Sequence, residues 1–213
     1  MKTILFQGDS ITDVGRIRQD PADLGAGYPR FVDGRLGLVA PGRYRVLNRG
    51  ISGDRVVDIY ARIKADILNL KPDYLSILVG VNDVWHELDA HNGVSAPKFR
   101  KIYGMLLEEI RQALPDTQIL LLEPFVLRGT ATAEHYPWFR QEVTARAAAV
   151  AELAREYGLP LLTLQADLDA LEKTAPEGWW LYDGVHPTAH FHQYLADKWL
   201  ALFREKMEAR DEA

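Results

Sequence analysis

Short apolar runs alternate along the chain with stretches in which apolar residues recur every three or four positions. Five runs have the length and composition of β-strands, and they cover residues 2–7, 45–48, 74–79, 118–122 and 160–164. The third and fourth runs are almost continuously apolar, which is typical of strands covered on both faces. The pattern therefore predicts a buried sheet with helices packed on it.

Four of the intervening stretches have helical periodicity, and they cover residues 54–70, 99–114, 138–157 and 190–207. In the first of them, Asp54 is a candidate N-terminal cap, and Ile59, Ile63 and Ile67 fall on one face. Alternating strands and helices predict a three-layer α/β/α fold with a parallel sheet. We expect the flavodoxin-like strand order 2-1-3-4-5, which binds ligands beyond the carboxyl ends of the strands.

The length and composition suit one soluble domain over residues 1–213, with residues 208–213 expected to fray. The 213 residues are 47% hydrophobic and 26% charged, with a net charge of -5 and no cysteine. The negative charge argues against nucleic-acid binding, and the missing thiols exclude disulfides and cysteine nucleophiles. The apolar stretch near the N-terminus is too short for a signal-peptide core, and no apolar run reaches about 18 residues. We therefore expect a cytoplasmic location without membrane insertion.

Two distant segments together contain the parts of a serine nucleophile system. Ser10 follows the first predicted strand in a Gly-Asp-Ser turn, and Asp183 precedes His186 by three residues. Acyl transfer needs a hydroxyl, a base that takes its proton, and a carboxylate that orients the base. Taken separately, Ser10 and Asp183 could be helix caps and His186 a surface residue. Their combination favours Ser10, His186 and Asp183 as the catalytic residues.

Two further segments end predicted strands and carry hydrogen-bond donors. Gly53 follows the second strand and Asn82 follows the third, so both fall on the same edge of the sheet as Ser10. The backbone N–H groups of Ser10 and Gly53, with the Asn82 side chain, would form an oxyanion hole. The alternative for Gly53 is an ordinary turn, and for Asn82 a helix cap. The shared edge favours the oxyanion hole.

Residues next to these segments are candidates for substrate contact, namely Asp9, Trp85, Trp180 and Tyr182. Aromatic faces offer a large contact area to a sugar ring or an apolar ester, although tryptophan also serves as core. His190 and His192 follow His186 closely, but residues 186 and 190 share a helical face that 192 does not. We therefore expect neither a metal site nor a cofactor.

Four segments resemble, in order along the chain, the four sequence blocks of the SGNH (GDSL-type) hydrolases. They are residues 8–12, Gly53, residues 80–83 and residues 183–187. Ile11 replaces the leucine of the GDSL name. The resemblance covers nearly the whole chain and implies the roles given above for Ser10, Gly53, Asn82, Asp183 and His186. The longer strings at residues 8–16, 48–53 and 80–85 are similar to small acetylxylan-esterase-type members. That similarity implies removal of acetyl groups from saccharides and a tendency to form homo-oligomers.

The leading hypothesis is thus a serine carboxylester hydrolase acting on small acetyl esters, including acetylated oligosaccharides. One alternative keeps the chemistry but enlarges the acyl group, as in a thioesterase or lysophospholipase. Another alternative is a flavodoxin-like binding module without catalysis. Carboxylates at positions 9 and 13 would repel a phosphate at this turn, which disfavours a nucleotide-binding module.

Overall fold

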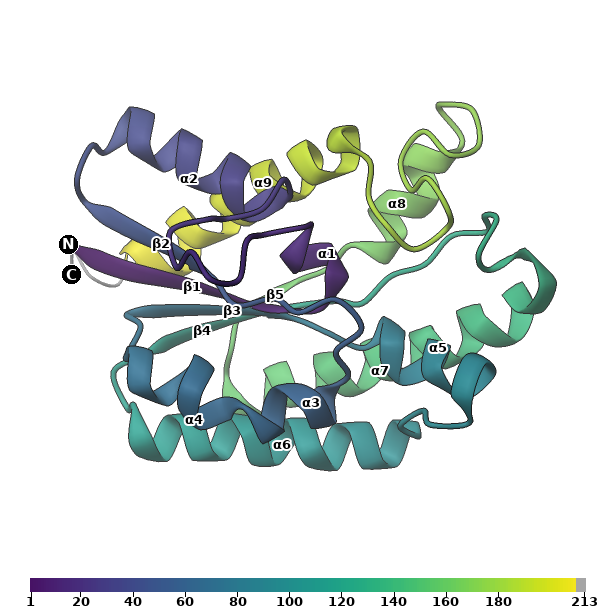
Figure 1. The fold of residues 1–213 in the computed structure, drawn as a ribbon, viewed down its shortest axis with the longest axis horizontal. Helices are drawn as coiled ribbons and strands as arrows, with labels where there is room; N and C mark the ends of the chain where they lie inside the picture. The colour runs from purple at the N-terminus through teal and green to yellow at the C-terminus, as the bar shows by residue number, and fades with distance from the viewer. Residues whose placement is uncertain (210–213) are drawn as a thin grey trace.

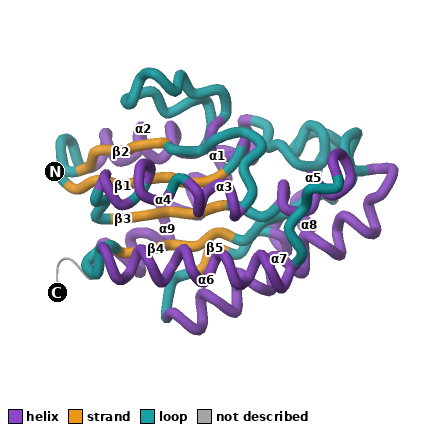
Figure 2. Tube along the Cα trace, turned by 60° about the horizontal axis from the view of Figure 1, so that its bottom comes forward, coloured by secondary structure: helices purple, strands orange, loops and turns teal. Residues whose placement is uncertain are grey.

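A parallel sheet forms the centre of the protein in the computed structural model, which describes residues 1–209 (Figures 1 and 2). The strand order is β2-β1-β3-β4-β5, as predicted from the sequence. The strands are β1 (Lys2–Gly8), β2 (Tyr44–Asn48), β3 (Tyr74–Leu78), β4 (Gln118–Leu122) and β5 (Leu161–Leu162). The predicted strand at 160–164 is thus shortened to two residues. The topology brings the ends of β1 and β3 next to each other, where ligands bind in such sheets.

Helices cover both faces of the sheet (Figure 1). One face carries α2 (Tyr28–Val39), α8 (Gln165–Glu172) and α9 (Ala189–Phe203), the last continued by η3 (Arg204–Glu208). The other carries α3 (Val56–Ala61), α4 (Ile63–Asp66), η1 (Leu68–Leu70), α6 (Ala96–Ala113) and most of α7 (Tyr136–Tyr157). Near the carboxyl edge lie α1 (Ser10–Asp13), α5 (Val81–Ala90) and η2 (Ala133–His135).

Successive residues of β1 supply two separate cores, because neighbouring side chains in a strand point to opposite faces. Ile4 and Phe6 belong to the core under α2 and α9, whereas Leu5 belongs to the core over α3 and α6. Trp199 of α9 packs against Phe6 with ring centroids 5.0 Å apart. All these side chains are buried, so the central strand is fixed from both sides.

The helix predicted at 54–70 is broken in the structure into α3, α4 and η1. Arg55, not Asp54, caps α3. The carboxylate of Asp54 instead accepts a hydrogen bond from Arg62 at 2.7 Å. Arg62 itself leaves helical geometry, with φ of -110°, and its guanidinium also reaches the Arg49 carbonyl. Tertiary contacts of one arginine thus override the local helical pattern.

Helices α1, α2, α5 and α8 were not predicted from the sequence. Helix α2 contains Gly34 and Gly37, which lower helix propensity and obscure the apolar pattern. Helix α5 begins at Val81 directly after Gly80, and α8 follows the last strand within a few residues.

Glu208, the first residue of the segment expected to fray, has partners in the structure. It accepts a hydrogen bond from the Tyr44 hydroxyl at 2.5 Å and pairs with Arg43 at 3.2 Å. These contacts keep η3 on the edge of the sheet. Residues 210–213 of the predicted tail lie outside the described residues. Among the helices of residues 1–209, none combines the length and apolar character that crossing a bilayer requires.

Candidate active site

Ser10 is the first residue of α1, in a tight turn directly after the central strand β1. Asp9 caps this short helix, and its Oδ1 accepts a hydrogen bond from the Ile11 N–H at 2.9 Å. The cap fixes the backbone on both sides of Ser10 and leaves the serine half-buried at the carboxyl edge of the sheet. Asp9 itself is buried beneath the turn. The structure therefore does not bring Asp9 to the surface as a substrate contact.

Three side chains form a continuous hydrogen-bonded chain at this edge. Ser10 Oγ lies 2.9 Å from His186 Nε2, and His186 Nδ1 lies 2.6 Å from Asp183 Oδ2. The hydrogen bond to Asp183 raises the pKa of His186 above its ordinary value, although burial opposes this. Burial also works to raise the pKa of Asp183, but hydrogen bonds from His186 hold it below its ordinary value. This arrangement allows an imidazole to accept a serine proton.

The loop that carries Asp183 and His186 is held by main-chain contacts. Asp183 Oδ1 accepts hydrogen bonds from the N–H groups of Val185 at 2.9 Å and His186 at 2.8 Å. The Ala131 N–H donates to the Asp183 carbonyl at 2.9 Å, and the Leu127 N–H donates to the Gly184 carbonyl at 2.8 Å. The carboxylate orientation is therefore set before any ligand binds.

Two aromatic rings flank the His186 ring. Tyr182 stacks on it with centroids 5.6 Å apart and planes at 15°, and Trp85 approaches at 5.9 Å with a tilt of 48°. Tyr182 is 58% exposed, so its outer face is open to a ligand. Trp180 does not join them. Its Nε1 donates to the Leu171 carbonyl at 2.8 Å, and the ring packs against the core.

The three predicted oxyanion donors lie around the same turn. Among residues 1–209, no protein acceptor takes the backbone N–H of Ser10 or of Gly53. Gly53 has φ of +88°, a left-handed conformation that other residues rarely adopt. Asn82 Nδ2 donates one hydrogen to the Asp54 carbonyl at 3.1 Å, which leaves its second hydrogen for a ligand.

A contact that the sequence reasoning missed joins the nucleophile turn to the Gly53 loop. Asp13 Oδ2 accepts hydrogen bonds from the Ser52 N–H at 2.9 Å and the Ser52 hydroxyl at 3.0 Å. Arg18 pairs with the same oxygen at 3.0 Å. Asp13 lies one helical turn after Ser10, and this spacing could have indicated a support for the turn. The contact fixes Ser52, the residue that precedes Gly53.

Two carboxyl groups are buried below this edge. Burial raises the pKa of Asp9 to about 7, and it raises the pKa of Asp83 to about 7 as well. Asp83 accepts the Val56 N–H with both oxygens at 3.2 Å, which ties α5 to α3. Each acid adjoins a predicted site residue in sequence, Ser10 and Asn82 respectively.

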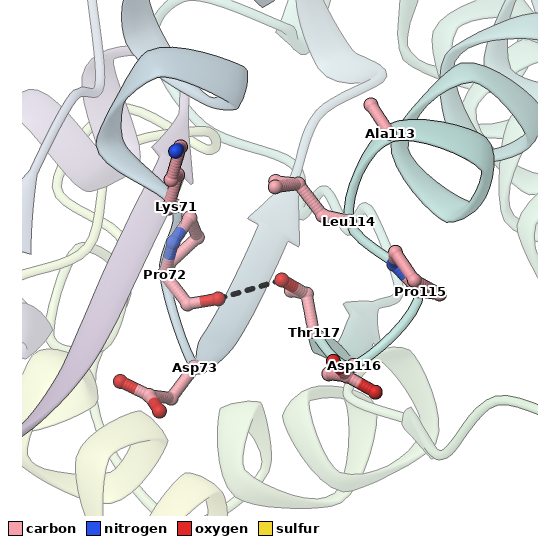
Figure 3. A pocket seen from close by; sticks show the side chains of 8 residues that line it. All are labelled: Lys71, Pro72, Asp73, Ala113, Leu114, Pro115, Asp116 and Thr117. Atoms are coloured by element: carbon pink, nitrogen blue, oxygen red, sulfur yellow. Dashed lines mark hydrogen bonds between the residues drawn. The ribbon is translucent and has the colours of Figure 1, made fainter.

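An open hollow of about 360 Å³ lies over the serine and histidine. It is lined by Ser10, Val14, Gly15, Ser52, Tyr182, His186, Pro187 and His192. A second hollow, of about 310 Å³, lies where β3 and β4 begin, and there the Thr117 hydroxyl donates to the Pro72 carbonyl at 2.6 Å (Figure 3). Because strands start at that second hollow, it is at the opposite end of the sheet from Ser10. In the described part of the chain, no three His, Cys, Asp or Glu side chains are arranged to hold a metal ion.

Solved structures of other proteins are similar to this chain over almost its whole length. A candidate GDSL-like lipase from Parabacteroides merdae superposes with a TM-score of 0.88 at 36% identity, over 94% of both chains. The acetylxylan esterase of Geobacillus stearothermophilus superposes with a TM-score of 0.84 at 33% identity, over 94% of this chain and 93% of that one. In sequence, that esterase is 34% identical over 92% of this chain and 91% of its own length.

Catalytic variants of the Geobacillus esterase replace a serine, an aspartate or a histidine by alanine, and its aspartate precedes its histidine by three residues, as Asp183 precedes His186. The GDSL-like Lipase/Acylhydrolase family matches residues 6–194, which include all the residues of the hydrogen-bonded chain. A binding module without catalysis is not favoured by these relatives. The chain belongs to the GDSL-like lipase/acylhydrolase family.

Proposed function

We propose that this chain is a serine carboxylester hydrolase that removes acetyl groups from saccharides, with Ser10 as nucleophile, His186 as base and Asp183 as its partner. The observation that carries the proposal is the 2.9 Å contact between Ser10 Oγ and His186 Nε2, continued to Asp183 at 2.6 Å. A serine in a surface loop without such a partner would remain a poor nucleophile, because its hydroxyl loses its proton reluctantly.

In the first half of the reaction, Ser10 Oγ attacks the ester carbonyl while its proton moves to His186 Nε2. The carbonyl oxygen becomes negative and receives hydrogen bonds from the N–H groups of Ser10 and Gly53 and from Asn82 Nδ2. Asp183 stabilises the imidazolium without taking its proton. His186 then protonates the leaving alcohol oxygen, and the acetyl group stays on Ser10.

In the second half, a water molecule takes the place of the alcohol, and His186 removes one of its protons. The water oxygen attacks the acetyl carbonyl, and the tetrahedral intermediate again places its negative oxygen among the three donors. Collapse breaks the bond to Ser10 Oγ, which recovers its proton from His186. Acetate leaves and the enzyme returns to its starting state.

The assignment of acetyl saccharides rests on two supports. The relative that aligns along almost the whole chain is an acetylxylan esterase. The exposed face of Tyr182 stands beside His186 at the open hollow, where a flat ring suits the apolar face of a sugar. An acetylated oligosaccharide is thus the proposed natural substrate.

Cytoplasmic location and assembly into homo-oligomers stay predictions from the sequence. Light scattering after gel filtration tests the assembly into homo-oligomers.

The Ser10→Ala variant tests the proposal. With p-nitrophenyl acetate we expect its turnover to fall by at least about 10³, with unchanged thermal unfolding, because the acyl-enzyme cannot form. A fluorophosphonate probe should label the wild type at Ser10 and leave the variant unlabelled. Wild-type turnover in the variant would refute the nucleophile. Faster hydrolysis of octanoyl than of acetyl esters would refute the short acyl group and favour a lysophospholipase.

A further inference from the structure

His192 is a second histidine at the hollow, and neither the proposed acid-base pair nor the oxyanion donors use it. It lies on α9 and is 3% exposed, yet it lines the hollow together with Ser10 and His186. Its ring packs in parallel with the Tyr28 ring, at 6.4 Å between centroids and 16° between planes. The side chain is therefore held in one orientation next to the proposed nucleophile.

One ring nitrogen of His192 is already occupied. Nδ1 accepts a hydrogen bond from the backbone N–H of Tyr28 at 3.2 Å. Tyr28 begins α2, so this N–H is one of those that a helix cannot satisfy internally. A main-chain N–H can only donate, so Nδ1 must present its lone pair. In a neutral imidazole the proton is then on Nε2.

The imidazole stays neutral where the enzyme would work. Burial, with a smaller contribution from the charge of His186, lowers the pKa of His192 to about 4. Within residues 1–209 no protein acceptor takes the Nε2 proton. Nε2 is also not among the fully buried polar atoms that lack a hydrogen-bond partner. The Nε2–H group is thus an oriented donor that opens to the hollow, and the imidazole is neutral near pH 7.

The acetyl group itself leaves no oxygen for this donor. Its carbonyl oxygen goes to the three oxyanion donors, and its ester oxygen receives the proton of His186. An additional donor in the same hollow is therefore free to pair with an oxygen of the alcohol part of the substrate. In a saccharide, the hydroxyl on the carbon next to the acetylated one lies beside the reacting ester, and His192 lines the same hollow as Ser10 and His186.

We propose that His192 is a substrate-binding residue whose Nε2–H donates a hydrogen bond to a saccharide hydroxyl neighbouring the acetylated position. This inference rests on the proposed function. It gives the enzyme a preference for acetylated polyols over simple alkyl or aryl acetates. A site that hydrogen-bonds a substrate hydroxyl rejects the analogue without it, because the buried donor is then left unpaired.

Two substitutions separate this binding role from the contact with Tyr28. In His192→Asn the side-chain oxygen can replace Nδ1 as acceptor, but no donor reaches the position of Nε2. In His192→Gln the amide reaches that position, and the bond to Tyr28 is given up. His190→Asn is the matched control, since His190 is on the same helix, exposed, and stacked on Trp179 at 4.4 Å.

The substrates are a methyl xyloside with one acetyl group and its analogues in which one neighbouring hydroxyl is replaced by hydrogen. For the wild type we expect kcat/KM to fall about tenfold for one deoxy analogue, as for the loss of one hydrogen bond. In His192→Asn the two substrates should differ less than threefold, whereas His192→Gln and His190→Asn should keep most of the preference. Thermal unfolding checks that the variants are folded.

A His192→Asn enzyme that still discriminates tenfold would overturn the binding role. So would a wild type that hydrolyses acetyl xylosides without distinguishing any deoxy analogue. If His192→Gln loses stability and slows equally on every substrate while His192→Asn is unimpaired, the residue is only a support for α2. A wild type that hydrolyses no acetyl ester, p-nitrophenyl acetate included, would overturn the proposed function and this inference with it.

Discussion

Replacing Asp183 by asparagine should inactivate the enzyme with almost no change in shape. The reason is the way Asp183 is held. Its Oδ1 accepts two main-chain N–H groups, at 2.9 Å and 2.8 Å, and only an oxygen can stay there. The new amide nitrogen must then face His186 Nδ1, at the place where Oδ2 now lies 2.6 Å away. It would donate to Nδ1 and move the ring proton to Nε2.

With its proton on Nε2, His186 can donate to Ser10 Oγ but can no longer accept a proton from it. The corresponding change in serine proteases lowers kcat by about 10⁴, or roughly 5 kcal/mol of transition-state stabilisation. We expect a similar loss here with little change in KM, since the ester contacts remain. The pKa of His186 should fall as well, because its hydrogen bond with the Asp183 carboxylate is the main cause of its raised value.

Steady-state hydrolysis of p-nitrophenyl acetate between pH 5 and 9 measures both effects. Asp167→Asn is a suitable control, because the carboxylate of Asp167 in α8 also has partners, Lys198 and Tyr194, and does not line the hollow. It should retain full turnover. If Asp183→Asn keeps kcat within tenfold of the wild type while remaining folded, the tautomer argument is wrong.

Three further predictions follow from the same geometry. Asn82→Ala should lower kcat by about 10²–10³ with KM nearly unchanged in the same assay, and a change confined to KM would contradict an oxyanion role. In the wild type, kcat/KM should rise with pH along a limb above the ordinary histidine pKa of about 6.5, because Asp183 raises the pKa of His186, and a flat profile would exclude it as base. The folded state raises the pKa of Asp9 to about 7, so it holds a proton that the unfolded chain releases near pH 4. The wild type should therefore lose up to about 1.4 kcal/mol of unfolding free energy per pH unit between those values, and Asp9→Asn should lose less. Urea unfolding at pH 5 and pH 8 measures this difference, and parallel pH dependences would argue against a protonated Asp9.

The sequence predicted those features that depend on a local pattern of residues. The apolar runs predicted all five strands, because a strand that is buried on both faces must be almost continuously apolar. The alternation of strands and helices predicted the strand order that the structure has. Ser10, Asp183 and His186 were also found from sequence, since the chemistry dictates their types and the Asp183 to His186 spacing dictates their proximity. The structure brings these three together as expected.

The features that the sequence did not predict depend on contacts between distant residues. Asp54 fits a cap by type, but Arg62 claims its carboxylate. Asp9 stands next to the nucleophile in sequence, yet it points under the turn and is buried. Trp180 belongs to an aromatic cluster in sequence, but its indole is tied to the Leu171 carbonyl. In each case the position of the side chain depends on a partner that is distant in sequence or on burial in the fold. The local sequence pattern does not contain that information.

The separation of Ser10 and His186 by 176 residues has a consequence for biosynthesis. During synthesis the serine emerges well before the histidine, so its hydroxyl stays an ordinary alcohol until the segment that carries Asp183 and His186 has emerged and docked. Incomplete translation products should thus be inert toward esters. During refolding, hydrolysis should accordingly recover only when the segment with Asp183 and His186 docks beside Ser10. This recovery should come later than the formation of secondary structure.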